Sequence, residues 1–306
     1  MWLEGKASHF VSRAQESDLG LEAFAVAFDG KIVFETHVNM DMPRNVCSYT
    51  KSVLSACIGV AISKGAISLE TSIADCFPEL LTDQNETKLS SIRLKHLLTM
   101  SSGFGKSLLM RRDREAGIGA PDCISYLCEL PMQFVPGSKF CYSTADSILA
   151  GRMLEKKTGK PLDYFLNEML FRDLEISTPR WECCPLGHPL GGGGLYLSLK
   201  DMMKFGQLFL DKGCYQGKQL IPETWVTLAT QKQIGIGETE QYAKSVGYGY
   251  QFWIQKRPGS FRMHGSYGQD TFVLSKEHIV VSMQCSESGK AKDLIQLLHQ
   301  EVLDAL

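Results

Sequence analysis

Four consecutive residues have the types and the spacing that nucleophilic catalysis requires. Ser48-Tyr49-Thr50-Lys51 is an S-x-x-K tetrad at the start of an apolar run, residues 53–62. Residues three apart lie on the same face of a helix, so the Lys51 ammonium can sit beside the Ser48 hydroxyl. A serine needs such a neighbouring base or charge to act as a nucleophile at neutral pH. The tetrad therefore indicates a candidate nucleophile, Ser48, and a candidate base, Lys51.

Two other interpretations of the tetrad stay open. Serine and asparagine commonly cap the start of a helix, and Ser48 or Asn45 could serve only that purpose. Cys47, which directly precedes Ser48, could be a rival nucleophile. Its neighbours fit a packed thiol better than a reactive thiolate.

The surrounding chain predicts the elements that would hold these residues. Residues 22–28 and 31–35 form two strand-like runs joined by Asp29-Gly30, a strong hairpin signal. The apolar run after Ser48 predicts a helix that ends at Lys64-Gly65, since glycine commonly stops a helix. A second helix is predicted over residues 146–157, closed by Thr158-Gly159.

Strand patterns return late in the chain, and together with the hairpin they define the expected architecture. They lie at residues 250–254, 260–263, 270–274 and 279–283, and an apolar stripe over residues 294–305 predicts a final helix. We expect an α+β fold, with an antiparallel sheet built from both termini (1–70 and 190–306) and flanked by helices. A mostly helical domain (71–189) is inserted, and the active site would lie in the cleft between the two domains.

Two further segments carry side chains that could join the chemistry. Tyr142 lies in a loop before the second predicted helix, where its phenol could project into a cleft or simply be packed. His264, at a strand end, could bind a carboxylate or support proton transfer, although a lone histidine is commonly structural. The neighbouring glycines, Gly265 and Gly268, would let a ligand approach backbone N–H groups. The glycine run at 191–194 also needs a structural reason.

Several other functional classes are disfavoured by missing motifs. The segment ending in Gly105-Lys106-Ser107 lacks the first glycine of a P-loop, because Met100 occupies that place. No G-x-S-x-G elbow is present, which argues against an α/β-hydrolase. None of the ten cysteines forms a C-x-x-C pair, so we expect neither a metal site nor a cofactor.

The composition limits which partners the protein could bind and in which compartment it would work. The chain of 306 residues is 44% hydrophobic and 22% charged, and its formal net charge of −2 gives no attraction for nucleic acid or membrane. The N-terminus leads into a mixed polar sequence with no secretory signal, and no apolar run reaches the ~18 residues that span a bilayer. With its unpatterned cysteines, the sequence predicts a cytoplasmic protein. The oligomeric state stays open.

Taken together, these motifs resemble the serine β-lactamase and penicillin-binding-protein superfamily, most closely the branch of class C β-lactamases, DD-peptidases and related esterases and amide hydrolases. The tetrad is similar to the first motif of that family, and Tyr142-Ser143-Thr144 to the second, usually Tyr-x-Asn. His264-Gly265-Ser266 falls where the third motif, Lys-Thr-Gly or His-x-Gly, belongs. Residues 93–103 and 191–206 resemble the family's "LLTHTSG" and "GGL-STA-DLARFG" stretches, and the whole resemblance covers about residues 20–285.

Two departures from the family's pattern bear on the substrate. Thr144 replaces the usual asparagine, which in the family helps to hold the amide carbonyl of the substrate. Matching Gly265 and Gly268 to the family's two glycines puts His264 where threonine usually stands and Met263 where lysine or histidine stands. Both changes resemble the esterase and amide-hydrolase members more than the β-lactamases.

The resemblance implies a serine hydrolase that cleaves an ester, amide or β-lactam bond of a small-molecule substrate through an acyl-enzyme. Ser48 would attack the carbonyl, and Lys51 and Tyr142 would share the proton transfers. By analogy, the backbone N–H groups of Ser48 and Ser266 would form the oxyanion hole. His264 is a further catalytic candidate. The candidate substrate-binding residues are Thr144, Gly265 and Gly268.

Two alternatives come from other functional classes. A non-catalytic or slowly deacylating penicillin-binding or sensor protein could use the same scaffold, although the complete set of Ser48, Lys51 and Tyr142 favours a hydrolase. A cysteine-based redox or metal protein is disfavoured by the lack of paired cysteines.

Overall fold

The computed structural model describes residues 2–177, 180–237, 244–287 and 289–305. The helices are α1 (Trp2–Glu16), α2 (Thr50–Ser63), α3 (Ile73–Cys76), α4 (Glu86–Ser91), α5 (Leu94–Leu98), α6 (Arg111–Glu115), α7 (Cys123–Glu129), α8 (Thr144–Thr158), α9 (Leu162–Leu166), α10 (Leu199–Leu210), α11 (Glu223–Ala229) and α12 (Ala291–Leu298). The strands are β1 (Leu21–Phe28), β2 (Lys31–His37), β3 (Arg44–Asn45), β4 (Tyr196–Leu197), β5 (Cys214–Tyr215), β6 (Lys218–Gln219), β7 (Ser245–Tyr248), β8 (Trp253–Gln255), β9 (Ser260–Gly265), β10 (Gln269–Leu274) and β11 (Ile279–Cys285).

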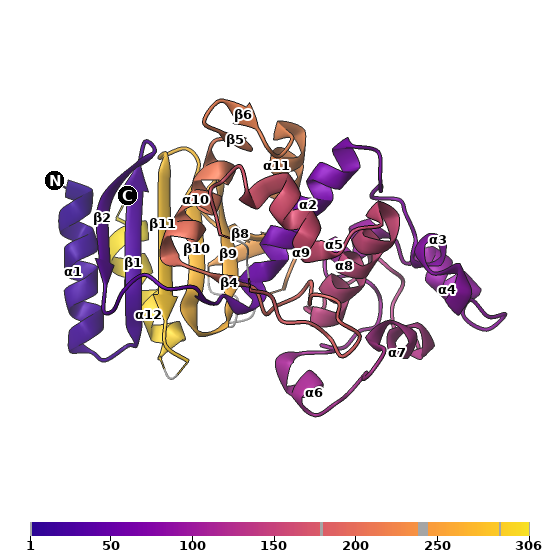
Figure 1. The fold of residues 1–306 in the computed structure, drawn as a ribbon. Coiled ribbons are helices and arrows are strands. Elements are labelled where there is room, and N and C mark those ends of the chain that lie inside the picture. The colour runs from indigo at the N-terminus through magenta and orange to yellow at the C-terminus, as the bar shows by residue number, and fades with distance from the viewer. Residues whose placement is uncertain (1, 178–179, 238–243, 288, 306) are drawn as a thin grey trace.

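A seven-stranded antiparallel sheet occupies one side of the molecule (Figure 1). Its strand order is β2-β1-β11-β10-β9-β8-β7, so the N-terminal hairpin pairs directly with the last strand of the chain. The hairpin turn forms at Asp29 and Gly30, which both have positive φ values of 46° and 75°, as a tight hairpin turn requires. The predicted α+β fold, with a sheet built from both ends of the chain, is confirmed.

Different helices cover the two faces of the sheet. The side chains that β1 presents on one face are large, and those on the other face are small. Phe24 and Val26 of β1 face the layer formed by α1 and α12, whereas the alternate residues are alanines that face α10. Gly206 lets α10 approach closely, since a Cβ there would lie 2.6 Å from a methyl group of Val280. The sheet is therefore buried on both sides over its central strands.

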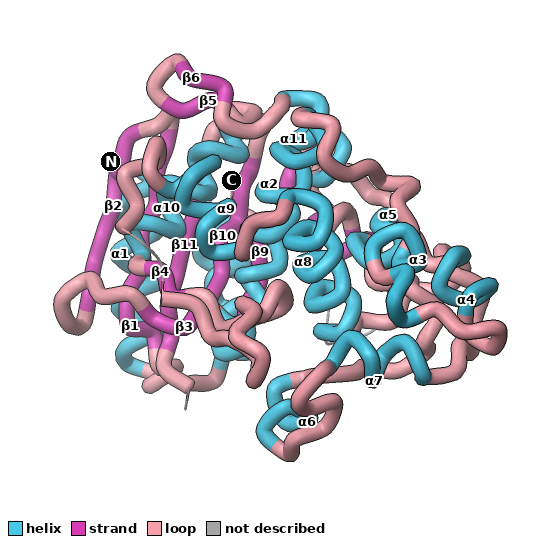
Figure 2. Tube along the Cα trace, turned by 45° about the vertical axis from the view of Figure 1, so that its right-hand side comes forward, coloured by secondary structure: helices cyan, strands magenta, loops and turns pink. Residues whose placement is uncertain are grey.

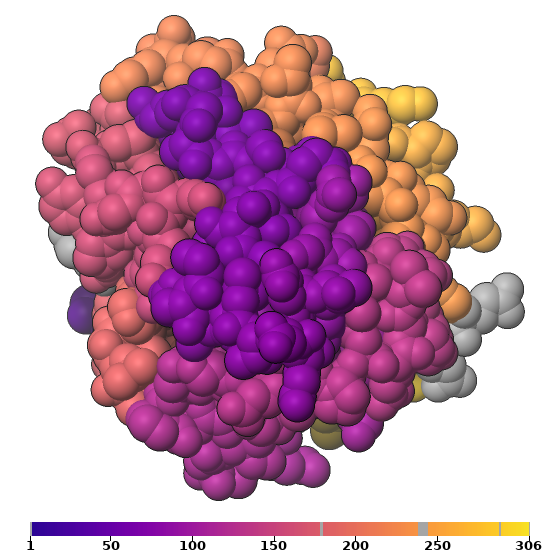
Figure 3. Space-filling view, turned by 90° about the vertical axis from the view of Figure 1, so that its right-hand side faces the viewer, coloured from indigo at the N-terminus to yellow at the C-terminus, as the bar shows by residue number. Residues whose placement is uncertain are grey.

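The remaining helices form the other side of the molecule, around α2 (Figure 2). Residues 50–61 of α2 are all buried, as expected for a helix that is apolar on every side and packs inside a core. Helix α2 packs against α8 and α11, and one hydrophobic cluster runs from it into both halves of the chain. The segment from α3 to α5 covers the far end of the molecule (Figure 3). The division into two domains at residues 71–189 stays a prediction.

Most of the predicted elements are present, and the differences are as follows. The predicted helices at 146–157 and 294–305 correspond to α8 and to α12 with its π-turn (His299–Leu303). The N-terminal segment forms α1, a helix that the sequence analysis missed; its apolar stripe is Leu3, Ala7, Phe10, Val11 and Ala14. The sequence analysis also missed β7.

The strand predicted at residues 250–254 is wrong at its start, because only β8 (Trp253–Gln255) pairs. Gln251 has a φ of 69° and turns the chain inward. Its buried amide donates to the carbonyls of Leu97 and Leu98, and accepts a hydrogen bond from Ser147 at 2.7 Å. These hydrogen bonds fix the turn against α5 and α8.

Candidate active site

Ser48 lies in a 3₁₀ turn (Cys47–Tyr49) that leads directly into α2, so the nucleophile candidate stands at the helix entrance. Lys51, one turn later, donates a hydrogen bond from its Nζ to the Ser48 Oγ at 3.0 Å. The predicted Ser–Lys contact is therefore present in the structure. The Ser48 hydroxyl is partly exposed to a cavity, whereas Lys51 is 1% exposed.

The environment of Lys51 favours its neutral form. Burial, with the nearby charge of Arg114, lowers the pKa of Lys51 from 10.5 to about 7. Its Nζ also donates to the carbonyl of Gly192 at 2.5 Å, which holds the amine beside Ser48. A large fraction of Lys51 is then unprotonated at neutral pH and can accept the Ser48 proton.

The glycine run at 191–194 has a structural reason. A Cβ at Gly191 would lie 2.5 Å from the carbonyl oxygen of Ser147, and one at Gly192 would lie 2.7 Å from the Thr144 methyl group. Only glycine lets this backbone press against α8 and bring the Gly192 carbonyl to Lys51. The following strand, β4, pairs with β3 just before Ser48, which ties the two segments together.

Tyr142 lies beside Lys51. The Lys51 Nζ lies 5.3 Å from the centre of the Tyr142 ring. That ring stacks on Trp253 with 5.6 Å between centroids and meets Tyr248 edge to face at 6.4 Å. The aromatic cluster therefore fixes the ring on the wall of the Ser48 cavity.

The third predicted segment reaches Ser48 through a close backbone approach. A Cβ at Gly265 would lie 2.1 Å from the carbonyl oxygen of Val46, so the end of β9 touches the chain that leads to Ser48. This contact puts Ser266 on the walls of the same cavities as Ser48. Gly268 has a φ of 81° and serves a turn. Neither Gly265 nor Gly268 is among the described residues that line these cavities.

His264 belongs to a polar cluster that the sequence analysis did not foresee. Its Nδ1 lies 2.8 Å from Oδ1 of Asp270, which also accepts a hydrogen bond from Nε of Arg262 at 2.6 Å. Burial and the charge of Arg262 lower the pKa of His264, so the imidazole is neutral at pH 7. Burial alone would raise the pKa of Asp270, but Arg262 and His264 outweigh it and lower that pKa. An ionised Asp270 thus orients a neutral His264, whose ring borders the cavity.

Two adjacent cavities, of about 130 and 110 Å³, share Ser48, Met110 and Ser266 on their walls. The first is completed by Tyr142, Ser245, Trp253, Arg262 and His264. Residues of the second include Asn45, Cys47, Arg111, Arg114, Thr144, Glu182 and Tyr267. Five of the predicted residues, namely Ser48, Tyr142, Thr144, His264 and Ser266, therefore meet at one place, with Lys51 directly beneath.

Thr144 and Cys47 have neighbours that bear on their predicted roles. Thr144 is the first residue of α8, is buried, and donates its hydroxyl to Sδ of Met110 at 3.3 Å. Burial raises the pKa of the Cys47 thiol to about 11, so this residue is protonated at neutral pH. Cys47 is therefore a poor rival to Ser48 as a nucleophile.

Within the part of the chain that the structure describes, no group of three or more His, Cys, Asp or Glu side chains could hold a metal ion. Among the described helices, none has the length and apolar character needed to cross a membrane.

Comparison with known proteins places this chain in a family. The β-lactamase family model matches residues 20–305 of the chain. The chain therefore belongs to the β-lactamase family, whose relatives with this fold include serine hydrolases.

Individual relatives are distant in sequence. Esterase EstB of Burkholderia gladioli is 22% identical over 293 residues, covering 74% of this chain and 73% of EstB. The chain spans between 20% and 43% of the length of the other curated relatives. Two solved structures share the fold. The octameric penicillin-binding protein homologue of Pyrococcus abyssi has a TM-score of 0.78 at 16% identity, and the match covers 100% of this chain and 78% of that chain. EstCE1, a hydrolase with promiscuous acyltransferase activity, has a TM-score of 0.77 at 16% identity, and the match covers 98% of each chain.

Proposed function

We propose that this protein is a serine hydrolase that cleaves a small ester or amide through an acyl-enzyme on Ser48. The hydrogen bond between the buried Lys51 amine, whose pKa is lowered to about 7, and the Ser48 hydroxyl is the observation that carries this proposal. A nucleophile and a base within hydrogen-bond reach are the minimum requirement for acyl transfer.

We assign the steps of the proposed reaction from the positions of the side chains. Lys51 Nζ takes the proton as Ser48 Oγ bonds to the carbonyl carbon, and the backbone N–H groups of Ser48 and Ser266 stabilise the oxyanion. The proton then passes to the leaving group, through Lys51 or the adjacent Tyr142, as the ester or amide bond breaks. Water attacks the acyl-enzyme with the same groups acting in reverse and regenerates the Ser48 hydroxyl.

An arginine beside the nucleophile suggests the charge of the substrate. Arg114 lines the second cavity and donates to the carbonyl of Leu109 at 2.7 Å, but has no carboxylate within ion-pair distance among the described residues. Its neighbour Arg111 is paired with Glu115 and Glu287. A half-buried guanidinium without a counter-ion fits a substrate that carries a carboxylate.

Replacing Arg114 by glutamine is expected to lower the preference for anionic substrates about tenfold, because one charge-assisted contact is lost. The measurement is the ratio of kcat/KM for p-nitrophenyl hydrogen glutarate to that for p-nitrophenyl butyrate. It is made near pH 9, well above the pKa of about 7 that Lys51 has in the unaltered protein. Arg112→Gln is the matched control, since Arg112 is exposed on the same helix and outside both cavities. An unchanged ratio in Arg114→Gln contradicts this assignment.

Thr144 and His264 differ from the residues that are usual in the family, and these differences support faster turnover of esters than of β-lactams. We expect hydrolysis of p-nitrophenyl butyrate to exceed that of nitrocefin by at least about 100-fold in kcat/KM. Parallel absorbance assays on one preparation test this expectation. A lasting adduct with penicillin and no ester turnover would instead identify the slowly deacylating sensor protein.

The thiols support the compartment that we propose. All ten cysteines are free, including several buried ones, which supports a reducing compartment such as the cytoplasm.

A further inference from the structure

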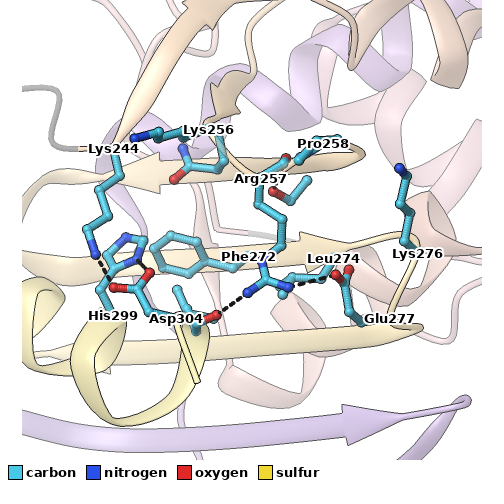
Figure 4. A pocket seen from close by; sticks show the side chains of 13 residues that line it. Lys244, Lys256, Arg257, Pro258, Phe272, Leu274, Lys276, Glu277, His299 and Asp304 are labelled. Atoms are coloured by element: carbon cyan, nitrogen blue, oxygen red, sulfur yellow. Dashed lines mark hydrogen bonds and ion pairs between the residues drawn. The ribbon is translucent and has the colours of Figure 1, made fainter. Parts of the chain in front are cut away.

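Two cavities of the described residues are several times larger than those at Ser48, and only one of the two borders the active site. The first, of about 730 Å³, lies beside the β8–β9 connection and the π-turn after α12 (Figure 4). Its lining includes the ion pair between Arg257 and Glu277. None of its described lining residues lines a cavity at Ser48. This cavity therefore offers no room into which a substrate held at Ser48 could extend.

The second large cavity is an open groove of about 670 Å³ beside α6, which we call the outer groove. Three of its lining residues, Met110, Arg111 and Tyr267, also line the cavity of about 110 Å³ at Ser48. The outer groove is therefore the neighbouring space that a group bound at Ser48 would enter if it were too long for the inner cavities.

Met110 lies at the boundary between these spaces. Among the described residues, it alone lines the outer groove and both cavities at Ser48. A side chain that borders three separate cavities lies where they meet, and here it separates the two inner cavities from the groove. The inner volumes, about 130 and 110 Å³, are well below the ~300 Å³ at which sites for drug-sized ligands begin. With Met110 in place, each inner cavity therefore has room only for a short group.

Contacts of its backbone and of its side chain hold Met110 in this position. Its backbone N–H donates to Oδ2 of Asp113 at 3.0 Å, which fixes the residue at the start of α6. Its Sδ accepts a hydrogen bond from the hydroxyl of Thr144 at 3.3 Å, and Thr144 is buried in the first turn of α8. A methionine side chain is flexible, so this contact favours one of its conformations. The single hydroxyl hydrogen of Thr144 is thereby used within the protein.

We propose that Met110 limits the size of the acyl group that Ser48 can accept, and that Thr144 is the positioning residue that holds Met110 in place. This inference rests on the proposed acyl transfer at Ser48. The substrate class is then an ester or amide of a short carboxylic acid, whose chain fits the inner cavity that Arg114 also lines. A chain of eight carbons would have to displace the Met110 side chain to reach the outer groove.

Hydrolysis of p-nitrophenyl butyrate and p-nitrophenyl octanoate tests the size limit. The measurement is the ratio of their kcat/KM values, which does not depend on how much of a preparation is folded. We expect the unaltered protein to favour the butyrate by at least about tenfold, since a single methylene that a pocket does not fit changes kcat/KM by this much. Met110→Ala should lower this preference at least about tenfold, because truncation opens the inner cavities to the outer groove.

Three further variants separate volume from the sulfur contact. Met110→Leu keeps nearly the same side-chain volume and should keep the preference for the butyrate. Thr144→Val removes the hydroxyl and should lower the preference about threefold, the effect of one neutral hydrogen bond. Thr144→Ser retains a donor and should keep the preference.

Met40→Ala is the matched control for truncation of a methionine. Met40 is 80% exposed and lines neither the inner cavities nor the outer groove. This variant should hydrolyse both esters as the unaltered protein does.

The outcomes distinguish this inference from the proposed function. Equal kcat/KM for the two esters in the unaltered protein, or an unchanged ratio in Met110→Ala, would overturn the size limit while Ser48 remains a hydrolytic nucleophile. An equally large loss of preference in Met110→Leu would also overturn it, because volume would not be the cause. An unchanged ratio in Thr144→Val would overturn the role of Thr144. Turnover of neither ester by the unaltered protein would contradict the proposed function, and this inference with it.

Discussion

Replacing Ser48 by alanine is expected to lower kcat/KM for p-nitrophenyl butyrate by at least about 10³-fold, because the acyl-enzyme cannot form without the hydroxyl. The fold should survive. Among the described residues, the hydroxyl of the half-buried Ser48 has one hydrogen-bond partner, Lys51, and Lys51 keeps its contact with the Gly192 carbonyl. We expect the free energy of unfolding to change by about 1 kcal/mol. Steady-state kinetics and thermal unfolding measure the two quantities.

Ser55→Ala is the matched control for this variant. Ser55 is fully buried in the same helix, and its hydroxyl has no hydrogen-bond partner among the described residues. Its replacement should leave turnover unchanged and stability equal or higher. Turnover at the unaltered rate in Ser48→Ala, with the fold intact, would exclude Ser48 as the nucleophile.

Replacing Lys51 by glutamine is expected to reduce kcat/KM about 10³-fold, the usual contribution of a positioned general base. The pH profile gives the more specific test. Because the pKa of Lys51 is lowered to about 7, kcat/KM of the unaltered enzyme should rise through pH 7 and level off above about pH 8. The amine becomes available as the pH rises above the pKa, so the sign of the dependence is positive. Lys51→Gln should lack this rise.

A second variant distinguishes Lys51 from other groups that titrate near neutrality. Arg114 is the largest charge that lowers the pKa of Lys51. Its replacement by glutamine should therefore move the inflection of the profile to higher pH, whereas Lys64→Gln should not move it. An inflection that stays in place in Arg114→Gln, or a flat profile in the unaltered enzyme, would show that Lys51 is not the base.

Local signals in the sequence predicted much of this structure. Asp29-Gly30 defined the hairpin, and Gly159 adopts the left-handed conformation that ends α8. The spacing of Ser48 and Lys51 correctly predicted their contact, since it depends only on helix geometry. The family's motifs indicated Tyr142 and Ser266 as site candidates, and both line the same cavity although they are far apart in sequence.

What the sequence did not predict depends on contacts between distant segments. That Arg114 has no carboxylate partner among the described residues is recognisable only once α6 and the glycine run line the same cavity. The pairing of His264 with Asp270 requires the register of β9 and β10, in which these two residues stand opposite each other. The apolar residues of α1 recur at helical spacing in the sequence. The sequence analysis considered only the mixed polar composition of this segment and therefore did not predict the helix. The periodicity of its apolar residues, rather than the composition of the segment, predicts this helix.

The most direct test of the account is intact-protein and peptide mass spectrometry after treatment with a fluorophosphonate. The probe phosphonylates an activated serine and displaces fluoride, which adds one label per chain. We predict a single adduct on Ser48 that is absent in both Ser48→Ala and Lys51→Gln. No adduct, or an adduct on Cys47 or on another residue, would contradict the claim that Lys51 activates Ser48 for acyl transfer.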